Sequence, residues 1–138
     1  MKRILTIAAL LAVSASTYAA SPALTVYKDP NCGCCEAWVK HVNQAGFRIK
    51  VIDSSDVATL KAKLGVPAHL ASCHTAVIDG GGQVVEGHVP AAAVRKLAAT
   101  PALKGVAVPG MPANSPGMGK MDGNLVTVDF SGRPFSKD

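Results

Sequence analysis

Two short segments of the chain alternate between apolar and polar residues, and a helical spacing of apolar residues lies between them. Residues 24–28 and 47–52 have the alternation that is typical of half-buried strands. Trp38 and Val42 fall on one side of a helix that we expect to begin within residues 32–35. The first part of the chain is therefore predicted to fold as strand, helix, strand.

Cap and stop residues mark where the helices begin and end. Ser55 can cap a short helix over residues 56–64, and Gly65 is placed to end it. Gly46 ends the first helix in the same way. Pro90 suits the first position of a third helix.

A run of three glycines predicts a hairpin, and a change of composition follows the third helix. Residues 75–79 and 83–86 are strands on either side of the glycines. The order β-α-β-α-β-β-α is the thioredoxin-like plan, so we expect an α/β fold. Prolines, glycines and methionines then predict an irregular loop over residues 100–124, followed by a last strand over 125–130.

The N-terminal residues have the pattern of an export signal. Two basic residues precede an apolar run over residues 4–13, which is too short to span a bilayer, and small residues follow. We expect residues 1–19 to be a signal peptide, leaving residues 20–138 as a single domain in the periplasm. An uncleaved N-terminal anchor is the alternative.

Charge and hydropathy argue against two classes of partner. The formal net charge of +5 falls to +3 when Lys2 and Arg3 are removed with the signal, and the remaining charges are scattered. We therefore expect no nucleic-acid partner. No second apolar run is long enough to cross a membrane, so we expect no membrane partner either.

Four cysteines carry the candidate chemistry. In an exported chain they would ordinarily form two disulfides, but three of them fall within residues 32–35, where a bridge closes almost no loop. In the predicted topology the first helix and the third strand begin at the same edge of the sheet. That edge brings together the four predicted metal ligands: Cys32, Cys34, Cys35 and Cys73.

The donor type indicates the metal. Soft thiolates select Cu(I), with zinc as the less favoured alternative, and the N-terminus of a helix stabilises thiolates. Adjacent Cys34 and Cys35 point in different directions, which suits bridging sulfurs in a small multinuclear Cu(I) cluster better than one tetrahedral zinc ion.

Other side chains at this edge leave the ligand set open. His74 and His88 could bind the metal, or could serve as a hydrogen-bonding and a packing residue. His41 is expected to face solvent, and His69 lies in a connector. Three loop methionines could add thioether ligands or pack the loop onto the core: Met111, Met118 and Met121.

Four ordered motifs resemble those of the CopG-type periplasmic metal-binding proteins. They are YKDPNCGCC at 27–35, SCHTA at 72–76, EGHVPA at 86–91, and AVPGMP at 107–112 followed by SPGM at 115–118. The resemblance implies a thioredoxin-like fold and a role in bacterial copper handling or resistance. It also implies the same four cysteines as ligands.

Three functions remain open from the sequence. The first is a Cu(I)-binding protein that sequesters copper or passes it to periplasmic efflux or carrier proteins. The second is a thiol–disulfide or copper oxidoreductase, which the Cys32 and Cys35 spacing favours. The third is a zinc-stabilised structural domain. In the oxidised metal-free protein we expect Cys32–Cys35 and Cys34–Cys73 bridges.

Overall fold

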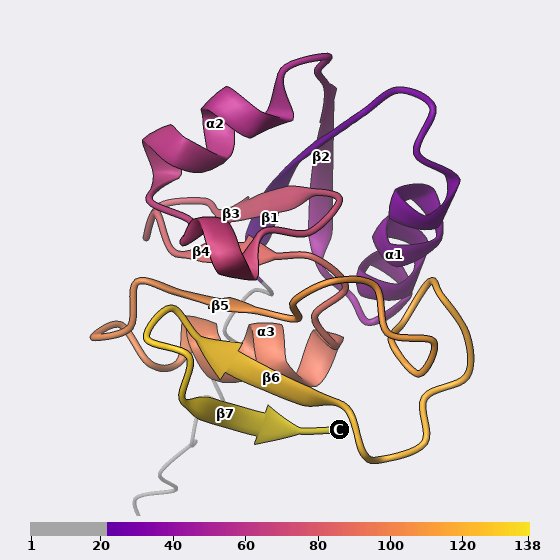
Figure 1. Ribbon diagram of the computed structural model, residues 1–138, viewed down its shortest axis with the longest axis vertical. Coiled ribbons are helices and arrows are strands. Elements are labelled where there is room, and N and C mark those ends of the chain that lie inside the picture. The colour runs from indigo at the N-terminus through magenta and orange to yellow at the C-terminus, as the bar shows by residue number, and fades with distance from the viewer. Residues whose placement is uncertain (1–21) are drawn as a thin grey trace, which may run out of the picture.

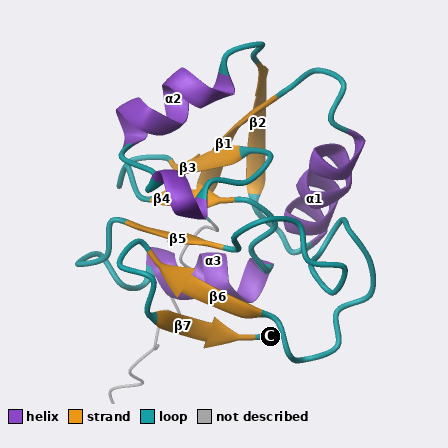
Figure 2. Ribbon diagram, in the orientation of Figure 1, coloured by secondary structure: helices purple, strands orange, loops and turns teal. Residues whose placement is uncertain are grey.

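The computed structural model describes residues 22–138, so the predicted signal peptide lies outside the described residues. Figures 1 and 2 show one mixed sheet with helices packed around it. The elements are β1 (Ala23–Lys28), α1 (Gly33–Gln44), β2 (Arg48–Asp53), α2 (Val57–Leu64), the 3₁₀ turn η1 (Ala68–Leu70), β3 (Thr75–Ile78), β4 (Val84–Glu86), α3 (Ala91–Ala98), β5 (Gly105–Ala107), β6 (Val126–Asp129) and β7 (Pro134–Lys137).

The sheet has the thioredoxin-like topology, with three further strands at one side. Its strand order is β2-β1-β3-β4-β5-β6-β7. β1 pairs parallel with β2 and antiparallel with β3, and β3 and β4 form the predicted hairpin. Because β3 runs against β1, the end of β1 and the start of β3 lie at the same edge. The predicted α/β fold is confirmed.

The two faces of the sheet are covered by different helices. Leu24 and Val26 of β1 are fully buried and belong to the main apolar core. Trp38 of α1 and Val94 of α3 join the same core, so α1 and α3 pack on that face. α2 covers the other face, and its Lys61 reaches polar side chains of β3 and β4.

Local chemistry corrects two predicted helix starts. Asp56, rather than Ser55, caps α2, because its carboxylate accepts the Thr59 N–H at 3.1 Å. Pro90 is the N-cap of α3, one position before the place predicted for it. Gly65 ends α2 with a left-handed φ of 74°, as predicted.

Two strands lie outside the predicted set. β5 falls inside the segment 100–124, which was expected to be irregular, and it pairs parallel with β4. β7 follows β6 and pairs antiparallel with it at the margin of the sheet. Within the described residues, none of the helices combines the length and apolar character needed to cross a bilayer.

Candidate metal centre

The first helix places three cysteines at one end of the sheet. Cys32 is the N-cap of α1, and its N–H donates to the Asp29 carbonyl at 3.1 Å. The Asp29 side chain in turn accepts the Asn31 N–H at 2.8 Å, which closes the turn out of β1. Cys34 and Cys35 follow in the first turn of the helix, and Cys35 is fully buried.

A buried lysine ties this end of the helix to the sheet. Lys28 is 1% exposed, and its Nζ lies 2.6 Å from Glu36 Oε1 and 2.9 Å from Asp53 Oδ1. The hydrogen bonds that this ammonium donates to Glu36 and then to Asp53 raise its pKa, so it is charged. Lys28 therefore links the ends of β1 and β2 to the first turn of α1.

The fourth cysteine, Cys73, lies just before β3. Tyr27 is opposite Thr75 in the sheet, so Cys73, two residues earlier, lies just beyond the end of β1. The Sγ atoms of all four cysteines lie within 4.8 Å of one another, which gives the predicted convergence. Metal–thiolate bonds are ~2.3 Å long, so sulfurs on one ion are at most about 4.6 Å apart.

The sulfurs are held in two redox states. Cys32 and Cys35 form a disulfide, as predicted for the metal-free protein. Cys34 and Cys73 carry free thiols, and the Cys34 Sγ lies 3.6 Å from that of Cys32. The second expected bridge, Cys34–Cys73, stays a prediction. Reduction of the disulfide is needed before all four sulfurs can act as thiolate ligands.

Two histidines flank the Cys73 thiol. Its Sγ lies 3.0 Å from His88 Nε2 and 3.3 Å from His74 Nδ1. His88 Nδ1 lies 2.8 Å from the Pro116 carbonyl oxygen, which can only accept, so Nδ1 carries the proton. In the neutral ring the Nε2 lone pair therefore faces Cys73. His74, His88 and Cys73 form a second group of donor atoms within 4.8 Å.

Burial keeps these groups uncharged. It lowers the pKa of His74 to about 3, with smaller electrostatic contributions from His88 and Lys61. Burial also lowers the pKa of His88, and the Pro116 carbonyl partly offsets that effect. The pKa of Cys73 is raised to about 11, chiefly by burial and then by Cys34. The helix N-terminus was expected to favour thiolates at the start of α1, whereas Cys73 lies before β3, where burial disfavours the thiolate form.

The C-terminal extension closes one side of the site. Gly117 has a φ of 91°, and a Cβ there would lie 2.8 Å from the Trp38 backbone nitrogen and 2.9 Å from the Cys34 carbonyl oxygen. Only glycine allows this approach, which carries the Pro116 carbonyl to His88. This role of Pro116 could not be predicted from the sequence, because the contact uses a backbone oxygen.

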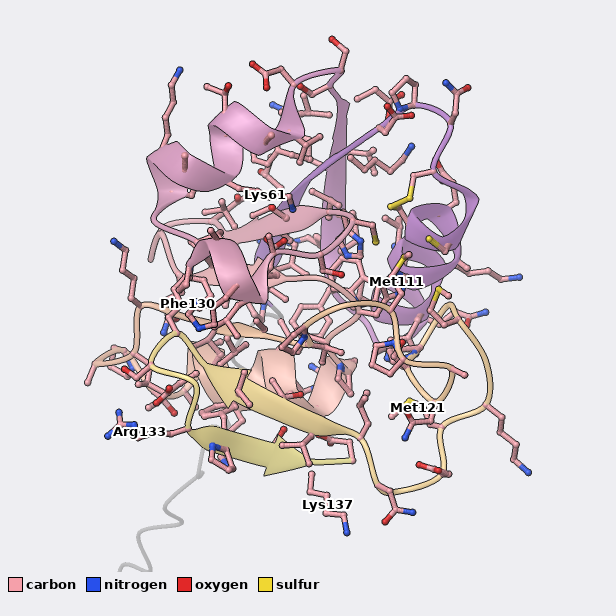
Figure 3. The ribbon with its side chains drawn as sticks, in the orientation of Figure 1. Lys61, Met111, Met121, Phe130, Arg133 and Lys137 are labelled. Carbon is pink, nitrogen blue, oxygen red and sulfur yellow. A yellow bond between two sulfur atoms is a disulfide. The ribbon has the colours of Figure 1, made fainter. Side chains whose placement is uncertain are left out.

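The three loop methionines differ in their exposure and surroundings. Met118 follows Gly117 and is 37% exposed, and Met111 is 54% exposed. Gly110, beside Met111, accepts a hydrogen bond of 2.5 Å from Ser72 Oγ. Figure 3 labels Met111 on the loop after β5 and Met121 farther along the same loop. Met111 and Met118 therefore each follow a glycine that contacts a residue of the cysteine site or its neighbour.

The remaining histidines have structural or surface positions. His41 was expected to face solvent, but it is half-buried and its Nε2 accepts the Ala91 N–H at 3.1 Å. This satisfies the first N–H of α3, and burial lowers the pKa of the ring. His69 is exposed on the 3₁₀ turn before Cys73.

Known proteins share both the fold and this site region. The family model "Protein of unknown function, DUF411" matches residues 70–118, which include Cys73, both flanking histidines and Met118. Among curated proteins, no match is found. A solved structure named "Copper resistance protein copG", Form 2, is 43% identical, with 86% of this chain and 98% of that chain covered and a TM-score of 0.73. Form 1 is also 43% identical, with 84% and 96% covered and a TM-score of 0.72. With that identity over most of both chains, the protein belongs to the CopG family of copper resistance proteins.

Proposed function

We propose that this protein binds Cu(I) through the thiolates of Cys32, Cys34, Cys35 and Cys73 once its disulfide is reduced. The observation that carries the proposal is the gathering of four sulfur atoms within 4.8 Å from segments far apart in sequence. Thiolates are soft ligands and favour Cu(I) among the available metals. The crowding of adjacent cysteines suits bridging sulfurs, so we propose a multinuclear cluster, with zinc as the competing metal.

The family and the N-terminal residues support a proposal for the cellular role. The solved relatives are named as copper resistance proteins. The basic residues and short apolar run at the start of this chain support export to the periplasm. We propose that the protein sequesters periplasmic Cu(I), or transfers it to a copper-efflux or copper-carrier protein.

A copper oxidoreductase is the second candidate, and one observation favours it. The Cys73, His74 and His88 group lies beside the four sulfurs and shares one of them. Imidazoles suit Cu(II), whereas thiolates suit Cu(I). In such a reaction the Cys32 and Cys35 thiols give up two electrons and two protons and form their disulfide, while two Cu(II) ions become two Cu(I) ions.

Competition against a chromophoric Cu(I) chelator, with reduced protein under anaerobic conditions, tests the first proposal. We expect Cys73→Ser to lower the Cu(I) affinity by at least ~10-fold, the scale of losing one metal ligand or its support. His69→Ala is the matched control, because His69 is exposed and lies four residues from Cys73. Unchanged affinity in Cys73→Ser contradicts the proposal, and preferential binding of zinc contradicts the choice of metal.

The same protein separates the two candidates. Cu(II) is added to the reduced protein under anaerobic conditions, and free thiols and paramagnetic Cu(II) are counted. Thiols of any protein can reduce Cu(II) at two thiols for every two Cu(II) ions, so the rate is compared with that of His88→Ala, which lacks one imidazole of the second donor group. A copper oxidoreductase that uses this group reacts more slowly in the variant, whereas a protein that only binds Cu(I) loses thiols and Cu(II) at the same rate in both.

A further inference from the structure

A fully buried carboxylate holds the segment that carries Cys73. Glu86, at the end of β4, is 0% exposed, and its Oε1 accepts the Ser72 backbone N–H at 2.7 Å. Its Oε2 accepts the Thr75 hydroxyl at 2.6 Å. Ser72 and Thr75 stand on either side of the Cys73–His74 pair. The two carboxylate oxygens of Glu86 therefore bind the residue before Cys73 and the residue after His74.

Lys61 of α2 supplies the positive charge that pairs with Glu86. Its Nζ lies 2.5 Å from Glu86 Oε1 and 2.8 Å from Thr75 Oγ1, and its side chain is 12% exposed. Figure 3 shows Lys61 between α2 and β3. Glu86 and Thr75 point to the sheet face that α2 covers, where Lys61 meets them. Trp38 and the main core lie on the opposite face. The network is thus separate from the core that stabilises the fold.

The neighbouring backbone leaves the segment little freedom to move. Gly87 has a φ of 74°, and a Cβ there would lie 2.6 Å from the Ser72 Cβ. Ser72 Oγ also donates to the Gly110 carbonyl. Ser72 is therefore fixed on three sides, by Glu86, by Gly87 and by the extension. Cys73 is the next residue, so its backbone is held in place as well. This holds although Cys73 lies before β3 and outside its strand pairing.

Stability alone does not account for such a pair. Burying a carboxylate with an ammonium costs desolvation energy that an apolar pair of similar size avoids. A buried polar network is justified when it fixes one arrangement of the groups around it. Here the groups that it fixes are the backbone neighbours of a sulfur shared by both donor groups.

We propose that Glu86, supported by Lys61, is a positioning residue that sets the Cys73 sulfur against the other three. The inference rests on the proposed copper site for its purpose, but its geometry can be tested without copper. If the Cys73 sulfur is held next to Cys34, the two thiols should form a disulfide readily. Oxidised glutathione takes their two electrons and two protons and becomes two molecules of reduced glutathione.

The test equilibrates the full metal-free chain in glutathione buffers and measures the Cys34–Cys73 bridge by alkylation and peptide mass. We expect Glu86→Leu to lower the equilibrium constant of that bridge by ~10-fold and the Cu(I) affinity by a similar factor. Glu86→Gln should restore most of both, because its amide can accept the Ser72 N–H and donate to Thr75. The Cys32–Cys35 bridge, inside α1, should change little.

Asp129→Asn is the matched control. Asp129 is 6% exposed, and its carboxylate also accepts backbone N–H groups and pairs with a cation, Arg133. It lies in the turn between β6 and β7, outside the network of Glu86. Figure 3 shows Arg133 at that turn, away from Lys61. If Glu86→Leu does not fold, Thr75→Val removes one of the two contacts and carries the same test with a smaller expected loss.

Each outcome has a fixed meaning. The inference is overturned by a bridge equilibrium within ~2-fold of the wild type in folded Glu86→Leu, because losing a buried hydrogen-bond partner ordinarily costs more than that. If Glu86→Leu does not fold, the same result in Thr75→Val overturns it. An equal loss in Asp129→Asn also overturns it, because the effect would then reflect general stability. A weakened bridge with unchanged Cu(I) affinity supports the positioning role and contradicts the proposed copper site.

Discussion

The raised pKa of Cys73 predicts how copper affinity depends on pH. In the metal-free protein this thiol has a pKa of about 11, because it is buried and lies beside Cys34. It is therefore protonated throughout the neutral range, and a thiolate ligand must lose that proton when the metal binds. Affinity should rise with pH until the pH approaches that pKa, and should fall as the solution is acidified.

The size of the effect follows from one displaced proton. Each proton lost on binding makes the affinity ~10-fold stronger per pH unit. Between about pH 6 and about pH 8 the Cys73 proton alone therefore contributes about 100-fold. His74 adds nothing to this slope, because its pKa of about 3 leaves it neutral over the whole range.

The comparison with Cys73→Ser isolates that single proton. Cu(I) affinities of both proteins are measured by chelator competition at several pH values, with the chelator's own protonation subtracted. The logarithm of the wild-type affinity should rise more steeply than that of the variant, by about one per pH unit. Parallel slopes would show that Cys73 does not bind copper as a thiolate, and the reasoning from its burial would be refuted.

Three further predictions concern the supports of the site. Trp38→Phe removes an indole N–H that donates to a buried carbonyl at 2.8 Å, so we expect a loss of about 3 kcal/mol in urea unfolding; less than about 1 kcal/mol would contradict this account. Gly117→Ala should destabilise the protein and weaken Cu(I) binding more than Gly110→Ala, which has a similar positive φ but open space around its Cβ; equal effects in unfolding and chelator assays would refute the close approach. Non-reducing peptide mapping of the air-oxidised protein should reveal a Cys34–Cys73 bridge beside Cys32–Cys35, and a dominant Cys34–Cys35 bridge would contradict the geometry.

The elements that the sequence predicts well are those with local signals. β1 and α1 have apolar residues at the spacing of their own periodicity, and Gly65 ends α2 through a left-handed turn. Once those elements are ordered, the antiparallel pairing of β1 and β3 brings Cys73 to the start of α1. The convergence of the cysteines was therefore predictable from element order alone.

The added strands lack such signals. β5 is three residues long and is stabilised by pairing with β4, about twenty residues earlier in the chain. β7 begins with a proline and is otherwise mostly polar, which is typical of a strand at the margin of a sheet. β4 is as short as β5, but the three glycines before it indicated a hairpin, and no such run of glycines precedes β5 or β7.

The polar supports of the site were missed for a different reason. Glu86 follows Val84 and Val85 in a buried strand, so a charged residue in an apolar run was the one visible signal of a buried network. Its partner Lys61 is 25 residues away on a helix with no buried residues. Such a pair depends on tertiary packing, and nothing in either local sequence specifies it.

The disulfide and the full thiolate site exclude each other, because they use the same sulfur atoms. With Cys32 and Cys35 bridged, the donors that remain are two thiols and the imidazoles of His74 and His88. Reduction adds two sulfurs and leaves the histidines unchanged, so the donor set becomes dominated by soft ligands. The redox state of one bond would then decide whether the site favours Cu(I), and Cys73 belongs to both donor groups.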